Sequence, residues 1–253
     1  AAKRENEAAF AEPGMFKNSY RARYPVANNL ISVIIPNKDK LDMLRSCVRT
    51  VSATKEGFEL EFVIVENGSV LPSTFAYYDK LEESGDGRIA RLDGDFNYSA
   101  ANNLGAKRAK GNLLLFLNND IRAEEAGWLT ALAVGAKLLF QDDSIQHAGA
   151  VVGLKGWADH ICAHLPADGA GRFACSHLVN TVRNVSAVTG ACMMVERRKF
   201  EAVGGFDERF VLCGSDVEFC LRLLRAGFRN VYTPYACLRH LESETRRDSP
   251  IPE

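Results

Sequence analysis

The sequence contains no apolar run long enough to cross a membrane and no excess of charge of one sign. Its 31 basic and 32 acidic side chains leave a net charge of -1, which gives no electrostatic footprint for nucleic acid. No apolar stretch reaches about 18 residues, and residues 1–12 are charged rather than signal-like. We therefore expect a cytoplasmic protein without a spanning segment.

Two further absences narrow the class of protein. The sequence has neither a G-x-G-x-x-G motif nor a P-loop, so it supports neither a dinucleotide-binding fold nor a Walker site. Its seven cysteines are odd in number and stand in apolar surroundings, which indicates buried, reduced thiols rather than a disulfide framework. What remains is a globular chain with 47% hydrophobic residues, ample for a sizeable core.

The pattern of residues predicts one domain between two flanking segments. Residues 1–29 mix charges, Asn and Pro without a sustained period, so we expect an arm or linker with room for one short helix. The domain should span 30–247, in two halves at 30–120 and 121–247. A short tail, 248–253, follows.

The first half alternates between strand and helix patterns. Strands are expected at 31–35, 62–65 and 113–117, and helices at 41–51, 73–83 and 100–109. A strand, a helix and a second strand in this order form a βαβ unit, which implies a parallel sheet. The fold class is therefore α/β, with a central, mostly parallel sheet flanked by helices.

The second half is less regular. Residues 126–140 read as an amphipathic helix with Trp128, Leu132 and Leu138 inward, and a Gly- and His-rich stretch follows at 147–177. Residues 185–195 are strand-like, 215–226 form a helix that stops at Gly227, and a short strand at 231–232 closes before Pro234.

Polar residues follow the ends of the predicted strands. Such residues are common wherever a chain turns, so one cluster means little. Four on one edge of a sheet mean more, because amides and carboxylates can bind a nucleotide and a carboxylate can hold a divalent cation. The four clusters are Asn37 with Asp39, Glu66 with Asn67, Asn97, and Asn118 to Asp120.

Asp216 and Glu218 open the helix at 215–226, and two interpretations are open. As helix caps, Ser215 or Asp216 would satisfy free amides and Glu218 would favour the helix dipole. As catalytic groups, only one carboxylate could serve a given atom, since positions two apart on a helix point about 160° from each other. Asp216, at the helix mouth, is then the candidate general base.

The histidines give weak signals by themselves. His160 and His164 flank Cys162, but without a second ligand pair this spacing is poor support for zinc. His240 is a lone histidine, and lone histidines are more often structural than metal-binding.

Seven short motifs in order carry a family resemblance. The sequence resembles family 2 glycosyltransferases of the GT-A fold, most of all the bacterial branch that builds rhamnose-containing and O-antigen polysaccharides. The resemblance covers about 30–247 and implies a nucleotide-binding half at 30–120 and an acceptor-binding half at 121–247. The motifs are VIIPNKD at 33–39, VENGS at 65–69, FNYS at 96–99, FLNND at 116–120, VTGAC at 188–192, GGFDE at 204–208 and DVEFCLR at 216–222.

The resemblance implies an inverting hexosyltransferase that uses a UDP- or dTDP-sugar, Mn²⁺ or Mg²⁺, and the hydroxyl of a glycan acceptor, free or lipid-linked. It places such an enzyme in the cytoplasm or peripherally at the inner face of the cell membrane. Its residue roles are carried over as follows: Pro36, Asn37, Asp39 and Glu66 around base and ribose, Asn97 and Asn102 near the nucleotide, and Asn118, Asn119 and Asp120 in place of the DxD motif.

The remaining roles concern the metal and the acceptor. Asp120 and His240 would bind the cation, Asp216 would be the base, and Thr189, Gly190 and Glu218 would line the sugar and acceptor pocket. Asn118 departs from the family by replacing the first acid of DxD. The chain also ends soon after His240 where relatives commonly continue, as expected for a piece of a longer, multi-domain enzyme.

Two other functions compete with this one. A catalytically silent GT-A module would bind nucleotide or glycan within a larger protein, although it would have no reason to keep both Asp120 and Asp216. A sugar-1-phosphate nucleotidyltransferase would need a Gly-rich, basic loop after the first strand, and residues 36–39 do not provide one.

Overall fold

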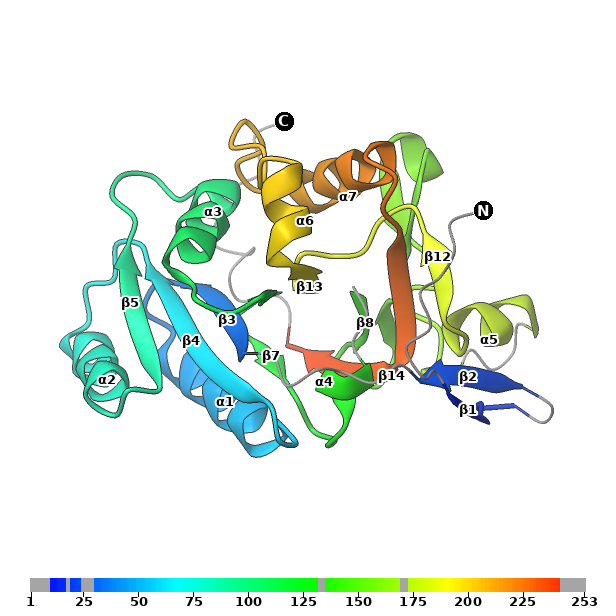
Figure 1. The fold of residues 1–253 in the computed structure, drawn as a ribbon, viewed down its shortest axis with the longest axis horizontal. Coiled ribbons are helices and arrows are strands. Elements are labelled where there is room, and N and C mark those ends of the chain that lie inside the picture. The colour runs from blue at the N-terminus through cyan, green and yellow to red at the C-terminus, as the bar shows by residue number, and fades with distance from the viewer. Residues whose placement is uncertain (1–9, 17–18, 24–29, 132–134, 169–172, 242–253) are drawn as a thin grey trace.

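A mixed β-sheet runs through the molecule, with helices on both of its faces (Figure 1). The computed structural model describes residues 10–16, 19–23, 30–131, 135–168 and 173–241. Within these residues the sheet has ten strands, eight of them in the order β12-β14-β8-β13-β6-β3-β4-β5. The predicted α/β class is confirmed.

The first half of the domain, residues 30–120, forms the parallel part of this sheet. Its strands are β3 (Leu30–Asn37), β4 (Glu59–Glu66), β5 (Gly87–Arg91) and β6 (Leu113–Leu117), and all neighbouring pairs among them are parallel. Helices α1 (Leu41–Ala53), α2 (Pro72–Glu83) and α3 (Tyr98–Arg108) connect them, as predicted.

Alternating side chains of the central strands fill two cores. In β6, Leu115 and Leu117 face the core under α1 and α2, whereas Leu114 and Phe116 face the core under α3, α6 and α7. Helix α3 approaches β3 closely because Gly105 has no side chain: a Cβ there would lie 2.3 Å from Ile34 Cγ2.

The second half of the domain, from residue 121, extends the same sheet with mixed strand directions, so the sheet is parallel in its first half only. β13 is antiparallel to β6, and β14 is parallel to β8. The strands are β7 (Ile121–Arg122), β8 (Gly135–Leu139), β9 (Ile145–His147), β12 (Arg183–Val185), β13 (Cys192–Glu196) and β14 (Asn230–His240). The helices are α4 (Trp128–Ala131), α5 (Phe173–Val179), α6 (Arg197–Ala202) and α7 (Ser215–Arg225).

The helix predicted at 126–140 is wrong. Trp128 is buried in the single turn α4, Leu132 lies outside the described residues, and Leu138 is buried in strand β8 instead. Packing decides this, because β8 lies against Val188 so closely that a Cβ at Gly135 would be 2.5 Å from Val188 Cβ. The spacing of apolar residues within 126–140 carries no information about that contact.

Two strand predictions also need correction. Only residues at the two ends of the expected strand 185–195 are in strands, β12 and β13. The last strand does not stop before Pro234; β14 continues through it to His240, with a register shift against β8 between Thr233 and Cys237. A proline fits in a strand where a bulge interrupts the ladder.

The described part of the N-terminal arm is a β-hairpin rather than a short helix. Strands β1 (Phe10–Pro13) and β2 (Tyr20–Arg23) pair antiparallel, and the Arg21 guanidinium lies 4.2 Å from the ring centroid of Tyr235 in β14. A cation and the face of an aromatic ring attract each other, so the contact between Arg21 and Tyr235 holds the hairpin against the sheet. Residues 1–9, 24–29 and the tail 248–253 lie outside the described residues.

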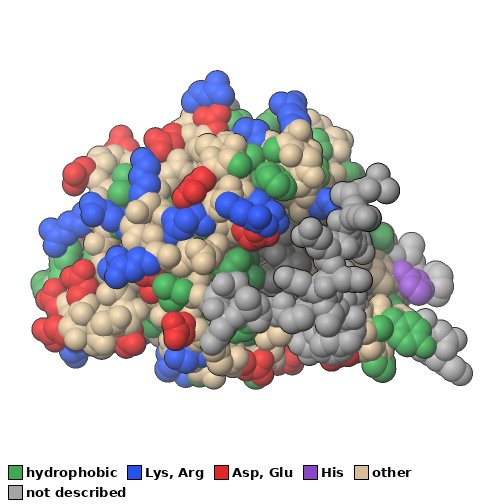
Figure 2. All heavy atoms as spheres, in the orientation of Figure 1, with side chains coloured by type: hydrophobic (Ala, Val, Ile, Leu, Met, Phe, Trp, Pro, Cys, Tyr) green, Lys and Arg blue, Asp and Glu red, His purple; other side chains and the backbone are tan. Residues whose placement is uncertain are grey.

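Basic and acidic side chains are interspersed on the face drawn in Figure 2. All seven cysteines are free thiols, although only Cys47, Cys192 and Cys220 are buried and Cys213 is exposed. None of the helices in the described ranges is long and apolar enough to span a bilayer.

A small second hairpin lies beside the sheet. It consists of β10 (Ala150–Val152), the 3₁₀ turn η1 (Leu154–Gly156) and β11 (Ala158–His160).

Candidate active site

Parallel strands bring the predicted polar clusters to one edge of the sheet. Asn37 and Glu66 are register partners at the ends of β3 and β4, and Asn118 follows the end of β6. This juxtaposition was predicted, because carboxyl ends of parallel strands meet at one edge. Pro36 lies beyond the last β3–β6 pair, so its missing N–H costs no ladder bond there.

A chain of hydrogen bonds joins these strand ends. Asn119 Nδ2 donates to Asn37 Oδ1 at 2.7 Å, Asn37 Nδ2 donates to the Tyr78 hydroxyl at 2.8 Å, and Tyr78 donates to Glu66 Oε2 at 2.7 Å. Burial raises the pKa of Tyr78, so its hydroxyl keeps the proton that it donates. Nothing in the sequence pattern singles out Tyr78, which lies on α2.

Asp39 lies at the same edge of the sheet and bonds the residues at the start of helix α2. Its carboxylate accepts hydrogen bonds from the backbone amides of Val70 and Leu71, at 3.1 and 3.0 Å, and from Thr74 Oγ1 at 3.3 Å. These groups begin helix α2, where free amides need acceptors. Asp39 therefore acts as a remote helix cap, and its expected contact with a nucleotide has no support from its bonds.

A hollow of about 200 Å³ opens where β4 and β5 end. Negatively and positively charged side chains and the ring of Phe75 surround this hollow, so it can accept a small planar ligand. The residues around it are Glu66, Gly68, Phe75, Arg91, Leu92 and Asp93.

Asn97 and Asn102 belong to helix α3 and its cap. Asn97 Oδ1 accepts from the Ala100 amide at 2.9 Å, and Asn97 Nδ2 donates to the Glu208 carbonyl at 2.8 Å. Asn102 is fully buried; its Nδ2 donates to the Tyr98 carbonyl, and its Oδ1 has no hydrogen-bond partner among the described residues. Their role near the nucleotide stays a prediction.

Asp120 and His240 meet at the far side of the same edge. Strand β14 pairs with β7 so that His240 lies opposite Ile121, and the Leu241 amide donates to the Asp120 carbonyl at 3.1 Å. Asp120 Oδ1 lies 3.1 Å from His240 Nε2, with side chains only 8% and 9% exposed. Oδ1 has no hydrogen-bond partner in the part of the chain that the structure describes.

Asp120 and His240 could supply two of the ligands of a divalent cation, and the other ligands would have to come from other molecules. A buried carboxylate oxygen without a hydrogen-bond partner, next to an imidazole nitrogen, is an incomplete set of hard and borderline ligands. Among the described residues no group of three or more His, Cys, Asp or Glu side chains could hold a metal ion. A cation here would therefore need oxygens from a bound ligand or water.

The zinc interpretation of His160 and His164 is not supported. His164 stacks on Phe140 with ring centroids 5.0 Å apart, whereas His160 Nδ1 lies 3.0 Å from His147 Nδ1. The two rings are thus used in separate contacts.

Asp216 stands at the first turn of α7, next to the predicted pocket strand. Its Oδ2 accepts from the Gly190 amide at 2.9 Å, and the Tyr98 hydroxyl donates to the Gly190 carbonyl at 2.9 Å. The Thr189 amide donates to His147 Nε2 at 3.3 Å. The structure thus brings Asp216, Thr189 and Gly190 together, as the resemblance implied. His147 was missed, because nothing in its spacing sets it apart.

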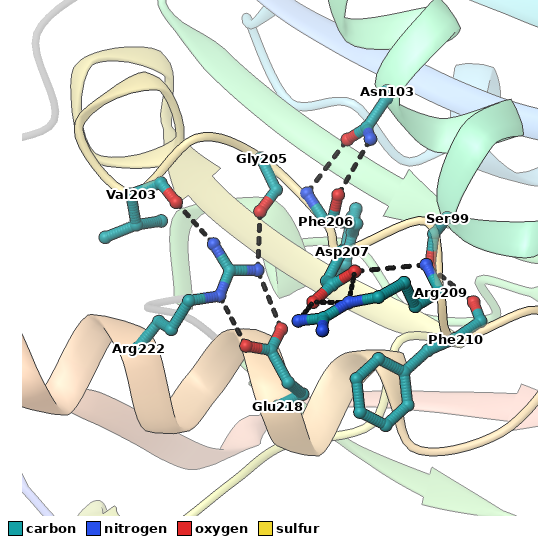
Figure 3. Close-up of polar contacts among 10 residues, drawn as sticks. All are labelled: Ser99, Asn103, Val203, Gly205, Phe206, Asp207, Arg209, Phe210, Glu218 and Arg222. Atoms are coloured by element: carbon teal, nitrogen blue, oxygen red, sulfur yellow. Dashed lines mark hydrogen bonds and ion pairs between the residues drawn. The ribbon is translucent and has the colours of Figure 1, made fainter.

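Glu218 is engaged elsewhere. Its carboxylate forms a two-pronged ion pair with Arg222, at 2.6 and 2.8 Å, on the side of α7 that faces residues 203–210 (Figure 3). Arg222 also donates to the carbonyls of Val203 and Gly205. The contacts of Glu218 therefore support a structural role, not the expected place in the acceptor pocket.

The same turn is tied to helix α3. Asn103 bonds the backbone of Phe206 in both directions, with Nδ2 to the carbonyl and the amide to Oδ1, both at 2.9 Å (Figure 3). Ser99 Oγ donates to the Phe210 carbonyl at 2.7 Å. The turn before Asp216 is thereby fixed to helix α3 of the first half of the domain.

Two overlapping family models cover nearly the whole domain. Residues 32–146 match Glycosyl transferase family 2, and residues 137–249 match Glycosyl transferase family group 2. The chain belongs to the family 2 glycosyltransferases.

A curated relative gives the context of that match. The chain is 45% identical over 247 residues to the O-antigen biosynthesis protein RfbC of Myxococcus xanthus. The alignment covers 92% of this chain and 19% of the relative, so the chain spans about a fifth of that protein's length.

Solved structures establish the fold as GT-A. One is GalNAc-T7 with UDP, GalNAc and Mn²⁺, with a TM-score of 0.64 and 17% identity over 87% of this chain and 45% of that chain. Another is the mannosyltransferase PcManGT of Pyrobaculum calidifontis with GDP-Man and Mn²⁺, with a TM-score of 0.62 and 12% identity over 92% of this chain and 61% of that one.

Proposed function

We propose that this domain is an inverting glycosyltransferase that moves a hexose or deoxyhexose from a UDP- or dTDP-sugar to a hydroxyl of a glycan acceptor. One continuous set of contacts carries the proposal. Asp216 bonds the Gly190 amide, and the next residue, Ala191, accepts from the Asn118 amide at 3.0 Å. Asn118 in turn contacts His240, the neighbour of Asp120. A candidate base and a candidate cation-binding pair therefore share one sheet edge.

The donor would lie along the edge formed by β3, β4 and β6. Its base would enter the hollow beside Phe75 and Arg91, and its ribose would meet the amides of Asn37 and Asn119. Asn118, which replaces the first acid of the DxD motif, offers its amide to His240 Nε2 at 3.3 Å rather than a charge to a metal. Asp120 is then the carboxylate of the site.

Asp120 Oδ1 and His240 Nε2 would hold Mn²⁺ or Mg²⁺ together with oxygens of the donor diphosphate. A bound cation of this kind supplies charge stabilisation for a departing diphosphate. Two structural neighbours were solved with Mn²⁺, which supports a divalent cation here.

Asp216 would take the proton from the acceptor hydroxyl as that oxygen attacks the anomeric carbon. Inversion requires attack on the face opposite the leaving group, and no enzyme nucleophile is needed. The Gly190 amide fixes Asp216 Oδ2, which leaves the carboxylate oriented before the acceptor arrives.

The acceptor would approach over the hairpin β10–β11. Trp157 is 59% exposed there, and a Cβ at Gly214 would lie 3.1 Å from its Cζ2, so the indole lies beside the residue that caps α7. This exposed ring beside Gly214, which lies two residues before Asp216 in the sequence, offers an apolar surface for a sugar face.

The relative RfbC suggests the biological process in which this domain acts. Because RfbC is an O-antigen biosynthesis protein, we assign this domain to bacterial surface polysaccharide synthesis, within a longer protein and with a free or lipid-linked glycan as acceptor.

A ligand panel followed by product analysis tests the function. UDP- and dTDP-sugars with Mn²⁺ should raise the melting temperature, since a ligand that binds only the native state stabilises it. The active donor should then yield a product with inverted anomeric configuration by NMR. Retention, or binding without transfer to any glycan hydroxyl, would contradict the proposal and favour a silent GT-A module.

A further inference from the structure

Gln146 holds the ring nitrogen of His240 that points away from Asp120. Gln146 is 6% exposed, and its Oε1 lies 2.7 Å from His240 Nδ1. An amide oxygen can only accept a hydrogen bond, so Nδ1 must carry the proton. A neutral imidazole has one such proton, and Nε2 is left with a lone pair.

Two contacts on the other side of the ring agree with this tautomer. Asn118 Nδ2, an N–H donor, lies 3.3 Å from Nε2 and needs an acceptor there. Asp120 Oδ1 lies 3.1 Å from Nε2 and still has no hydrogen-bond partner among the described residues. Two electron-rich atoms at this distance repel, unless a cation lies against both.

A β-bulge brings Gln146 to this place. Strand β9 pairs with β8 through Leu138 opposite His147 and Leu139 opposite Ile145, so Gln146 is the extra residue between the two pairs. Bulges commonly re-aim a side chain near an active site. Strand β8 in turn pairs with β14, which carries His240.

We propose that Gln146 is a positioning residue of the active site: by accepting from Nδ1–H, it keeps His240 in the tautomer whose Nε2 can bind a divalent cation. The inference rests on the proposed metal role of Asp120 and His240. Partners of this kind, which bind the second nitrogen of a metal-binding histidine, orient the ring and raise metal affinity.

The first test needs no metal and no substrate. Two-dimensional ¹H–¹⁵N spectra of the metal-free chain distinguish the two tautomers of each imidazole, and His240→Ala identifies the signals of His240 among the five histidines. The wild type should show Nδ1–H for His240, and Gln146→Leu should shift it toward Nε2–H. An Nε2–H tautomer in the wild type would overturn the proposal.

The second test measures Mn²⁺ affinity from the EPR signal of free Mn²⁺. Gln146→Leu should weaken binding about 10–100-fold. Gln146→Glu also offers an acceptor to Nδ1–H, so at pH 8 it should bind within about threefold of the wild type. Gln141→Leu is the matched control: Gln141 is the chain's other glutamine and is exposed, and its side chain bonds only the Leu241 carbonyl, at 3.4 Å, among the described residues.

The outcomes separate this inference from the proposed function. Wild-type affinity in Gln146→Leu, or an equal loss in Gln146→Glu, would overturn the role of Gln146. Absence of Mn²⁺ binding in the wild type, or binding that Asp120→Ala leaves unchanged, would instead overturn the metal role. If Gln146→Leu does not fold, the wild-type tautomer and the Gln146→Glu affinity still decide.

Discussion

Asp120 Oδ1 and His240 Nε2 lie 3.1 Å apart although the two residues are far apart in the sequence, because β14 pairs with β7 directly beside them. The pair is almost inaccessible to solvent, so a charge between these atoms would be poorly screened. This relationship places the proposed cation site at the junction of the two halves.

Asp120→Ala should remove metal-dependent nucleotide binding. The substitution deletes the one carboxylate of the pair, and we expect the affinity for UDP or dTDP in Mn²⁺ to fall by more than about tenfold. Calorimetry with and without Mn²⁺ measures this. Equal affinities of wild type and variant in Mn²⁺ would contradict the assignment.

Asp216→Asn should separate binding from transfer. Its amide oxygen can still accept from the Gly190 amide, so donor affinity should stay unchanged, whereas loss of the base should lower kcat about 10²–10⁴-fold. Initial rates with saturating donor and acceptor test this. Transfer at the wild-type rate would show that another group takes the proton.

Arg222→Ala and Glu218→Gln should affect stability more than catalysis. Arg222 bonds Glu218 and two backbone carbonyls, so its loss should lower the free energy of unfolding by about 2–3 kcal/mol, against about 1 kcal/mol for the partly exposed Glu218. Urea unfolding measures both. A raised acceptor KM in Glu218→Gln without loss of stability would restore Glu218 to the acceptor pocket.

The stability of the domain should fall in mild acid because of His147. Burial lowers the pKa of His147 well below its ordinary value of 6.5, so below about pH 6.5 the unfolded chain takes up a proton that the folded chain does not. Stability is thus complete above pH 6.5 and is lost as pH falls toward the folded pKa, at up to about 1.4 kcal/mol per pH unit.

His147→Asn should flatten this dependence between pH 7 and 5, and the same replacement at the exposed His164 should not. Urea unfolding at each pH gives the free energies. Parallel curves for the wild type and His147→Asn would mean that His147 titrates normally.

Trp157→Ala should weaken acceptor use selectively. Removing the exposed indole beside Gly214 should raise the acceptor KM about fivefold or more, as expected for the loss of about 1 kcal/mol of ring contact, with donor affinity unchanged. Kinetics with each substrate varied in turn test this. An effect on donor KM alone would place the hairpin on the donor side.

The elements that could be predicted depend on local periodicity. The runs 31–35, 62–65 and 113–117 are buried strands because their side chains face two cores, and parallel pairing then brings Asn37, Glu66 and Asn118 to one edge. The prediction failed at 126–140 because Gly135 packs on Val188 from a distant segment, a contact that apolar spacing does not encode.

The sequence by itself determined the α/β alternation, the motifs of a family 2 glycosyltransferase and the identity of Asp120 and Asp216 as candidates. The tertiary structure decided how these side chains are used. It pairs Asp120 with His240, engages Asp39 in a helix cap and Glu218 in an ion pair, and places Gln146 behind His240. The physical reason is that each of these contacts joins separate elements, whose packing is set by the whole core rather than by neighbouring residues.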